Sequence, residues 1–158
     1  MANLNRPKRM AMEVAAPVPG KGQVVVAVKA ASVNFPDVLV IQNKYQVKPP
    51  LPFVPGAEFA GVVEALGEGV TNVAPGQHVA VLAGMGGFGT HALAPADKVL
   101  PLPAEFPFEH AAAFALTYGT SHHALIDRAA LRAGETVLVL GAAGGVGTSA
   151  IQVAKAVG

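Results

Sequence analysis

Cysteine and tryptophan are absent from this sequence, and charged residues are scarce. Without cysteine the chain has no disulfide, no thiolate nucleophile and no zinc site that needs sulfur. Charged residues make up only 13% of its 158 residues, and the net charge is +1 with no basic run, which argues against a nucleic-acid-binding surface. Apolar residues make up 52%, so the composition predicts a globular chain of one or two domains and excludes a disordered one.

Two segments bear on export and on membrane insertion. Met1 to Arg9 is polar and basic and lacks the apolar run of a secretory signal. The stretch from Thr136 to Ala154 carries no charge and imitates a membrane span, but glycines at 141, 144, 145 and 147 interrupt it. A backbone that irregular cannot face lipid, because its polar groups would lack hydrogen-bond partners. We therefore expect a cytoplasmic protein.

Short strands separated by turn signals are predicted for most of the first hundred residues, after an irregular stretch over residues 1–15. Valine-rich or alternating segments bounded by glycine and proline predict the strands. They are Gln23–Ala30, Phe59–Leu66, Gln77–Leu82, Phe88–Leu93 and Lys98–Leu102. A helical turn is expected from Asp37 to Gln42, with Asp37 at its positive end. Many short strands with frequent turns are typical of a small β barrel or sandwich.

The pattern changes after about residue 105. Phe108–Leu116 is rich in alanine, and Tyr118–Ala130 has a helical pattern. Val137–Leu140 is a continuous apolar run, which a strand buried on both faces requires. Beyond it apolar residues recur at helical spacing, at Val146, Ala150, Val153, Ala154 and Val157. The order is therefore strands first, then one strand, loop and helix of α/β type.

Small residues join that predicted strand to that helix. In Gly141–Gly147, the three key positions of a dinucleotide fingerprint hold Ala142, Gly144 and Gly147. Gly144 would let backbone N–H groups approach a pyrophosphate, and Gly147 would let the helix pack closely on the strand. The helix N-terminus would supply partial positive charge. A tight turn without ligand is the alternative, but the buried strand before and the amphipathic helix after favour dinucleotide binding.

Several separated motifs resemble the medium-chain dehydrogenase/reductase superfamily, and within it the zinc-free quinone oxidoreductase (zeta-crystallin-like) branch. The glycine-loop region matches at Gly134-Glu135, Leu138, Ala142-Ala143-Gly144-Gly145, Gly147, Gln152 and Lys155. Upstream the matching segments are Ser32–Asp37, Tyr45-Gln46, Phe53–Gly61 and Leu116–Thr120. The resemblance runs from about residue 10 to the end and covers about half of such an enzyme.

The resemblance implies a mixed β then α/β fold. Residues 1–105 would form a GroES-like β barrel domain on the substrate side, residues 106–133 connecting helices, and residues 134–158 the first strand, loop and helix of a Rossmann dinucleotide-binding domain. The rest of the parallel sheet would be missing. We therefore expect a truncated chain that binds NADPH weakly, is inactive by itself and is covered by an assembly, such as a homo-oligomer.

Site residues follow from the same resemblance. Asn34 would approach the nicotinamide or the substrate, Tyr45 would line the acceptor pocket, and Thr120 would bind the cofactor together with Ala142, Ala143, Gly144, Gly145, Val146 and Gly147. Each has an ordinary structural alternative: Asn34 could satisfy loop backbone, Tyr45 could be a half-buried core aromatic, and Thr120 could cap a helix.

The resemblance also bears on metals. Zinc-dependent relatives place cysteine near position 34 and histidine at position 57, where this chain has Asn34 and Ala57. We therefore expect no zinc. Adjacent histidines, His122 and His123, diverge by about 100° on a helix and would not chelate as a pair four apart would. Glu58, expected in a loop before a strand, is interpreted as structural.

A reduced nicotinamide can deliver hydride to an acceptor without a Lewis acid, whereas alcohol oxidation needs one to stabilise an alkoxide. The predicted function is NADPH-dependent reduction of a quinone or conjugated carbonyl, with NADPH preferred over NADH on the resemblance alone. An enoyl or acrylyl thioester reductase of the same superfamily is the sibling alternative. A catalytically silent binding or structural module is the third.

Overall fold

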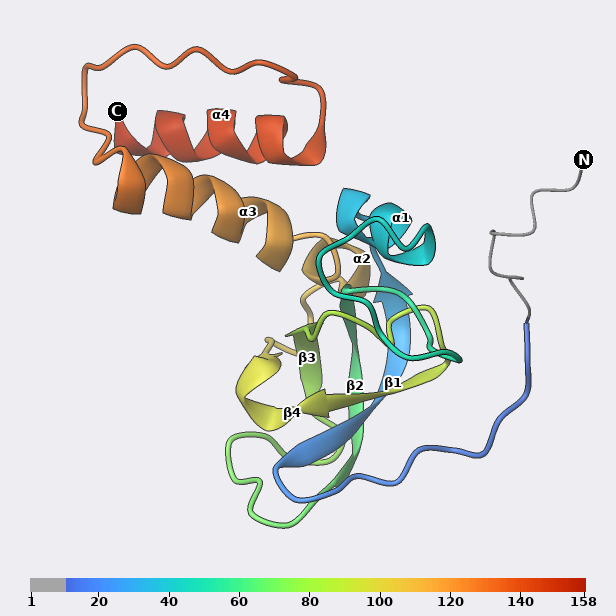
Figure 1. The fold of residues 1–158 in the computed structure, drawn as a ribbon. Coiled ribbons are helices and arrows are strands. Elements are labelled where there is room, and N and C mark those ends of the chain that lie inside the picture. Colours follow the sequence, from blue (N-terminus) through green and yellow to red (C-terminus); the bar gives the residue numbers. More distant parts are fainter. Residues whose placement is uncertain (1–10) are drawn as a thin grey trace, which may run out of the picture. The chain divides into compact units, whose positions relative to one another are not determined.

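The computed structural model describes residues 11–158. Residues 1–10 lie outside this range, so the expectation of an irregular start can be compared only over residues 11–15, and residues 11–20 hold neither helix nor strand. The chain divides into two compact units, the first ending at Ala112 and the second running from Ala113 to Gly158 (Figure 1).

An antiparallel sheet of five strands forms the body of the first unit. The strands are β1 (Gln23–Ala31), β2 (Glu58–Leu66), β3 (His78–Leu82), β4 (His91–Pro95) and β5 (Val99–Pro101). Their order in the sheet is β4-β1-β2-β3-β5. The β1–β2 pairing is the longest, with Val24 opposite Leu66 and Ala31 opposite Phe59, and it contains two register shifts.

One face of the sheet carries the main core. The alternation along the strands turns valines and Phe59 to this face. Its buried members are Val24, Val26, Phe59, Val63, Val73, Val79, Val81, Ala92, Ala94 and Val99. Both edge strands contribute to this one cluster, β4 through its alanines and β5 through Val99, so the sheet curls around it in the manner of a partly open barrel. The GroES-like β domain expected from the sequence is confirmed in this respect.

Short helices flank the sheet. α1 (Phe35–Ile41) follows β1, and a 3₁₀ turn, η1 (Ala96–Lys98), separates β4 from β5. α2 (Phe108–Ala111) packs against β1, β2 and β3. The contact is made of small side chains, with Ala60, Ala80, Ala111 and Ala112 forming a second buried cluster. Alanines on both surfaces let the helix approach the sheet closely.

The second unit consists of helices and loops. α3 (Ala115–His122) continues directly into η2 (His123–Arg128), a stretch of π-helix, and α4 (Gly145–Val157) ends the unit. α3 and α4 lie side by side (Figure 1). Two serines are buried between them, with Ser121 Oγ 2.7 Å from Ser149 Oγ, and Ser149 Oγ also donates to Thr117 O at 3.0 Å.

Most predicted strands lie where the sequence places them, but one boundary is wrong. β4 begins at His91 and not at Phe88. The backbone N–H of Phe88 bonds to Pro55 O at 3.0 Å, and that of Gly89 bonds to Gly86 O at 3.1 Å. These bonds hold the glycine-rich segment in a turn, so it cannot pair with β1.

Two helix predictions also need correction. The helical turn expected from Asp37 to Gln42 begins two residues earlier, at Phe35, because a proline and an aspartate suit a helix start. The helix expected from Tyr118 to Ala130 begins at Ala115, and its second half is the π-helical η2.

The prediction of a buried strand at Val137–Leu140 is wrong for the structure described. None of residues 113–158 forms a strand, and Leu138 and Leu140 are 84% and 85% exposed. A strand needs at least one partner strand, and residues 113–158 contain none, while the sheet of the first unit is antiparallel throughout. The glycine loop and the following helix are confirmed, so the observed order is an extended segment, a glycine loop and a helix.

Candidate functional site

Asn34 lies at the start of α1, where the chain leaves β1. It is the N-cap residue, with extended backbone angles and half-buried exposure. Its backbone N–H donates to Asp37 Oδ2 at 2.8 Å, and the backbone N–H of Asp37 donates to Asn34 O at 3.0 Å. This reciprocal pair fixes the first turn of α1, as a carboxylate at the third helical position commonly does.

Asp37 also ties α1 to the segment before β2. Its carboxylate is 5% exposed, and its Oδ1 accepts the backbone N–H of Ala57 at 2.9 Å. The helical turn and Ala57 are therefore locked together by one buried side chain. The sequence singled out Asp37 only for the positive end of the helix, and this long-range contact was missed.

Glu58 is fully buried at the first position of β2, and not in a loop as the sequence suggested. Its Oε2 accepts a hydrogen bond from Ser32 Oγ at 2.8 Å and lies 3.3 Å from Asn34 Nδ2. Asn34 Nδ2 also donates to Ser32 Oγ at 2.8 Å. The sheet brings these residues together, since the backbone N–H of Ser32 bonds to Glu58 O at 3.2 Å. A buried carboxylate surrounded by donors is the arrangement that burial of charge requires.

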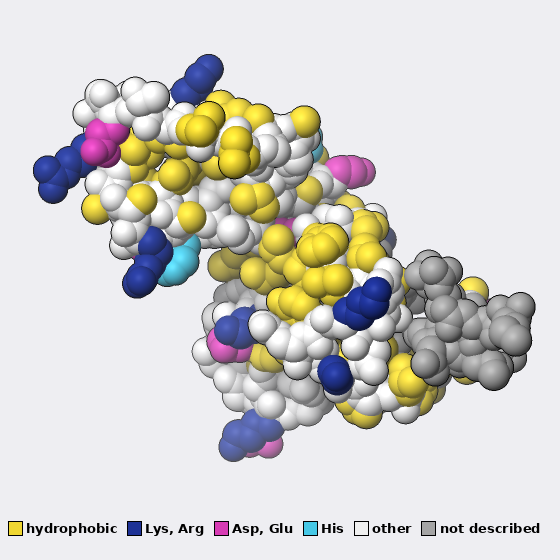
Figure 2. Space-filling view, turned by 45° about the horizontal axis from the view of Figure 1, so that its top comes forward, with side chains coloured by type: hydrophobic (Ala, Val, Ile, Leu, Met, Phe, Trp, Pro, Cys, Tyr) yellow, Lys and Arg dark blue, Asp and Glu magenta, His cyan; other side chains and the backbone are white. Residues whose placement is uncertain are grey.

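Exposed apolar side chains border this polar cluster. Val33 and Phe35, the two neighbours of Asn34 in the chain, are 75% and 73% exposed. Figure 2 shows broad areas of hydrophobic side chains on the surface that faces the viewer. Asn34 therefore offers a polar group at an apolar surface, which is the combination found in small-molecule sites.

Tyr45 lies in the bend after α1 and is half-buried. Asn34 and Tyr45 are thus at opposite ends of a helix of seven residues, about 10 Å long. The structure brings Asn34 together with Ser32, Glu58 and Asp37.

The glycine loop lies in the second unit. Gly141 has a positive φ of 72°, and the backbone N–H of Gly144 donates to Gly141 O at 3.1 Å, which closes the turn before α4. Gly144 is the N-cap residue, and no side chain caps the helix. The N–H groups of the first turn of an α-helix have no partner within the helix, so Gly145, Val146 and Gly147 offer donors at this end.

Gly147 is the position where the loop cannot accept a side chain. A Cβ added there would lie 2.3 Å from Gly141 O and 2.7 Å from Ala142 Cα. At Gly144 the nearest atom would be Gly141 O, at an ordinary 3.5 Å. The close packing expected of Gly147 is therefore present, while Gly144 is not required by packing.

Thr120 is exposed on α3, within the same unit as the glycine loop. Nearby on α3, the ring of Tyr118 stacks on Phe114 with centroids 4.6 Å apart, and its hydroxyl donates to Gln152 Oε1 on α4. Tyr118 is therefore engaged in holding α4, while the Thr120 side chain is left exposed.

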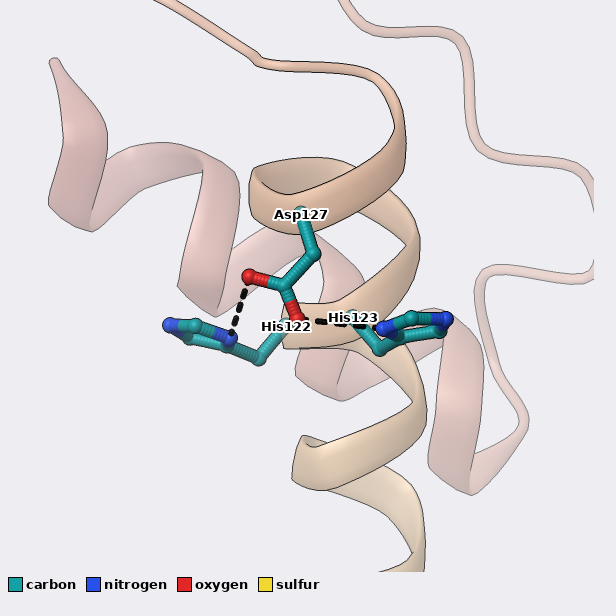
Figure 3. A network of polar contacts seen from close by, with 3 residues as sticks. All are labelled: His122, His123 and Asp127. Atoms are coloured by element: carbon teal, nitrogen blue, oxygen red, sulfur yellow. Dashed lines mark hydrogen bonds and ion pairs between the residues drawn. The ribbon is translucent and has the colours of Figure 1, made fainter.

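The two adjacent histidines both face one carboxylate. His123 Nδ1 lies 3.0 Å from Asp127 Oδ2, and His122 Nδ1 lies 3.9 Å from Asp127 Oδ1, on either side of it (Figure 3). All three side chains are exposed. Within residues 11–158, no group of three or more histidine, cysteine, aspartate or glutamate side chains is arranged to hold a metal ion. In the same range, no helix has the length and apolar character needed to cross a bilayer.

Comparison with known proteins places these features in a family. Residues 20–104 match the family described as the alcohol dehydrogenase GroES-like domain. A quinone oxidoreductase of Sus scrofa is 40% identical over 151 residues, which are 95% of this chain and 46% of that protein. The synaptic vesicle membrane protein VAT-1 homolog of Rattus norvegicus is 43% identical over 141 residues, 89% of this chain and 35% of that protein.

Solved structures agree. The quinone oxidoreductase from Thermus thermophilus, determined also in complex with NADPH, superposes with a TM-score of 0.80 at 37% identity, over 93% of this chain and 46% of that one. The chain thus spans about half the length of the quinone oxidoreductases that it matches. The resemblance and the fold class predicted from the sequence are confirmed, except that residues 137–140 form no strand in the structure described.

Proposed function

This chain belongs to the alcohol dehydrogenase GroES-like domain family, and we propose that it serves an oxidoreductase that transfers hydride from NADPH to a quinone or conjugated carbonyl acceptor without zinc. Support comes from the similarity to quinone oxidoreductases over 95% of the chain. A solved relative whose structure was determined with NADPH supports the choice of nucleotide.

The observation that carries the proposal is the uncapped start of α4 behind the glycine loop. At Gly144 an added Cβ would meet nothing closer than Gly141 O at 3.5 Å, so the backbone at this position is open to a bulky anion. The unpaired N–H groups and the helix dipole favour negative charge at this point. In the proposal Gly145, Val146 and Gly147 bind the nucleotide diphosphate through their backbone, Ala142, Ala143 and Gly144 shape the loop around it, and Thr120 contributes its hydroxyl.

In the proposal, the side chains nearest the reacting atoms, Asn34 and Tyr45, come from the first unit. Asn34 contacts the nucleotide or the acceptor with its amide, and Tyr45 lines the acceptor site. The exposed apolar residues beside Asn34 suit a flat apolar acceptor. The bound nucleotide would supply the hydride, while these residues bind and orient the partners.

Zinc independence rests on the donor set. The chain has no cysteine, and the resemblance places the cysteine of zinc-dependent relatives near position 34 and their histidine at position 57, where this chain has Asn34 and Ala57. An amide and a methyl group cannot replace a thiolate and an imidazole as zinc ligands.

Three further expectations from the sequence remain predictions. They are that the protein is cytoplasmic, that it forms a homo-oligomer, and that its domain boundaries fall at residues 105 and 133.

The test is an assay of NADPH oxidation with several acceptors, carried out on a protein of full family length that contains this chain, because the chain by itself is expected to be inactive. We expect turnover with a benzoquinone, less with an enoyl thioester, and none when an alcohol and NADP⁺ are supplied in the reverse direction. The matched variant is Gly144→Val, whose β-branched side chain would block the open loop while leaving α4 to fold. Equal rates for the wild type and Gly144→Val, or zinc-dependent alcohol oxidation, would contradict the proposal.

A further inference from the structure

Ser32, Asn34 and Glu58 form a hydrogen-bonded chain whose bond directions are set by chemistry. A carboxylate has no proton to donate, so Ser32 Oγ donates to Glu58 Oε2 across their 2.8 Å contact. The serine oxygen keeps lone pairs and accepts from Asn34 Nδ2 at 2.8 Å. Asn34 Nδ2 is also 3.3 Å from Glu58 Oε2. The amide nitrogen of Asn34 therefore faces inward.

The opposite orientation of the amide is disfavoured. Turning it over would place Asn34 Oδ1 about where Nδ2 lies, opposite the carboxylate oxygen, and two acceptors would meet without a proton between them. Such a contact costs free energy in a buried site, because the carboxylate would lose a donor that it needs. Glu58 is fully buried and cannot recover that donor from bulk water.

The backbone of Asn34 is held as firmly as its amide. Asp37 accepts the N–H of Asn34 with one carboxylate oxygen and the N–H of Ala57 with the other. The residue is thus anchored to α1 by its backbone and to β2 by its side chain.

The carbonyl oxygen of the Asn34 side chain keeps acceptor capacity. It takes part in the capping box of α1, facing the backbone N–H of Asp37, and that N–H is shared with the backbone Asn34 O at 3.0 Å. An amide oxygen has two lone pairs, so even a weak contact with the helix leaves one of them for another donor. Asn34 Oδ1 is therefore the part of the amide left to meet a ligand.

We infer that Glu58 and Ser32 are positioning residues that turn the Asn34 amide so that it presents its carbonyl oxygen, and that Asn34 therefore binds a hydrogen-bond donor on the nucleotide. This inference rests on the proposed function and makes it more specific. NADPH carries donors in its ribose hydroxyls and its carboxamide, whereas a quinone carries only acceptor oxygens. Asn34 thus selects and orients the nucleotide and does not polarise the carbonyl of the acceptor.

Amide orientation can be tested without any activity. In NMR spectra of the 158-residue chain labelled with ¹⁵N and ¹³C, the Nδ2 protons of Asn34 should show cross-relaxation to the side-chain protons of Ser32 and Glu58 and slow exchange with water. Rapid exchange of these protons, with no such cross-peaks, would overturn the inference whatever the enzyme does.

Ligand polarity is tested by titration of the same sample. NADPH should shift the Asn34 Cγ resonance, as expected for an oxygen that accepts a new hydrogen bond, and benzoquinone alone should not. A shift caused by benzoquinone and not by NADPH would overturn the inference. A shift of the glycine-loop amides by NADPH with no change at Asn34 would overturn it as well, while leaving the proposed function intact. If NADPH shifts no resonance at all, the proposed function fails, and the assignment of a nucleotide donor fails with it.

Variants separate positioning from folding. Ser32→Ala removes the bridging hydroxyl, Ser32→Thr keeps it, and Glu58→Gln replaces the carboxylate by a group that tolerates either amide orientation. Loss of one oriented hydrogen bond should weaken NADPH binding about fivefold in Ser32→Ala and Glu58→Gln, with Ser32→Thr restoring it. The control is Glu64→Gln, an exposed position on the same strand, paired with His91 at 3.0 Å. Equal NADPH affinity in all four variants would contradict a positioning role.

Discussion

At the scale of single residues, the structure differs from the sequence-based expectation mainly in contacts between side chains that are far apart in the sequence. The resemblance assigns both Asn34 and Tyr45 to the site, yet Asn34 contacts Ser32 and Glu58 while Tyr45 lies beyond the other end of α1. The structural interpretation of Glu58 agrees with its full burial. Its contact with Ser32 spans 26 positions, and no local pattern in the sequence carries that information.

Another residue-scale feature is His78, whose buried Nδ1 has no hydrogen-bond partner. Its ring lies against Phe108 with centroids 4.6 Å apart. His78→Phe should keep this contact and remove the unsatisfied atom, so the free energy of unfolding should rise by about 1 kcal/mol. Thermal unfolding measures this. The control is His110→Phe, an exposed histidine near Phe106, which should change stability little. A lower melting temperature for His78→Phe would contradict the prediction.

The glycine loop offers a second residue-scale prediction, in which two alanine substitutions have different effects. Gly147→Ala places Cβ 2.3 Å from Gly141 O, so it should lower the melting temperature and displace the loop. Gly144→Ala meets nothing closer than 3.5 Å, so it should leave the fold intact and weaken only nucleotide binding. Calorimetry with NADPH and thermal unfolding of both variants distinguish these effects. An equal fall in melting temperature in both variants would contradict the prediction, because it would mean that neither position has room for a methyl group.

At the scale of elements, local periodicity was sufficient for strands that pair within the first unit. β1, β2, β3 and β5 lie within two residues of their predicted bounds, because their valines alternate between a buried face and the opposite one. The apolar run at Val137–Leu140 carries an equally strong signal and forms no strand among the described residues. Its composition fits a strand, but pairing depends on neighbours that a local pattern does not specify.

Close approach of β1 and β2 gives an element-scale prediction. At Gly61, a Cβ would lie 2.1 Å from Ala27 O, so Gly61→Ala must push the two strands apart. Overpacking of this kind costs about 1–3 kcal/mol and should lower the melting temperature by several degrees. Gly119→Ala is the control, since nothing lies within 4 Å of that added Cβ and alanine favours a helix. Unchanged stability in Gly61→Ala would contradict the β1–β2 geometry.

At the scale of the whole molecule, the two units differ in how they are held together. The first has a continuous apolar core within a five-stranded sheet, and the second has only small buried residues, Ser121, Gly147 and Ser149, between its helices. The sequence predicted this change of character near residue 105. The sequence could not show that the second unit, as described, lacks a large apolar core. Its apolar residues have helical spacing whether or not other side chains pack against them.

Metal independence is a prediction for the molecule as a whole. In a protein of full family length that contains this chain, extended treatment with a strong chelator should leave the proposed NADPH-dependent quinone reduction unchanged, because Asn34 and Ala57 supply neither a thiolate nor an imidazole where the resemblance expects zinc ligands. A zinc-dependent alcohol dehydrogenase treated in parallel should lose its activity. Loss of quinone reduction that returns when zinc is added would refute zinc independence.

The central claim is that the open start of α4 binds the nucleotide diphosphate, and an amide NMR titration of the chain with NADPH tests it most directly. The account predicts saturable shifts of the Gly145, Val146 and Gly147 amides, larger than that of Gly144, whose N–H already bonds to Gly141 O. The same shifts should be much reduced in Gly144→Val. Binding of NADPH that leaves these three amides unmoved would contradict the account.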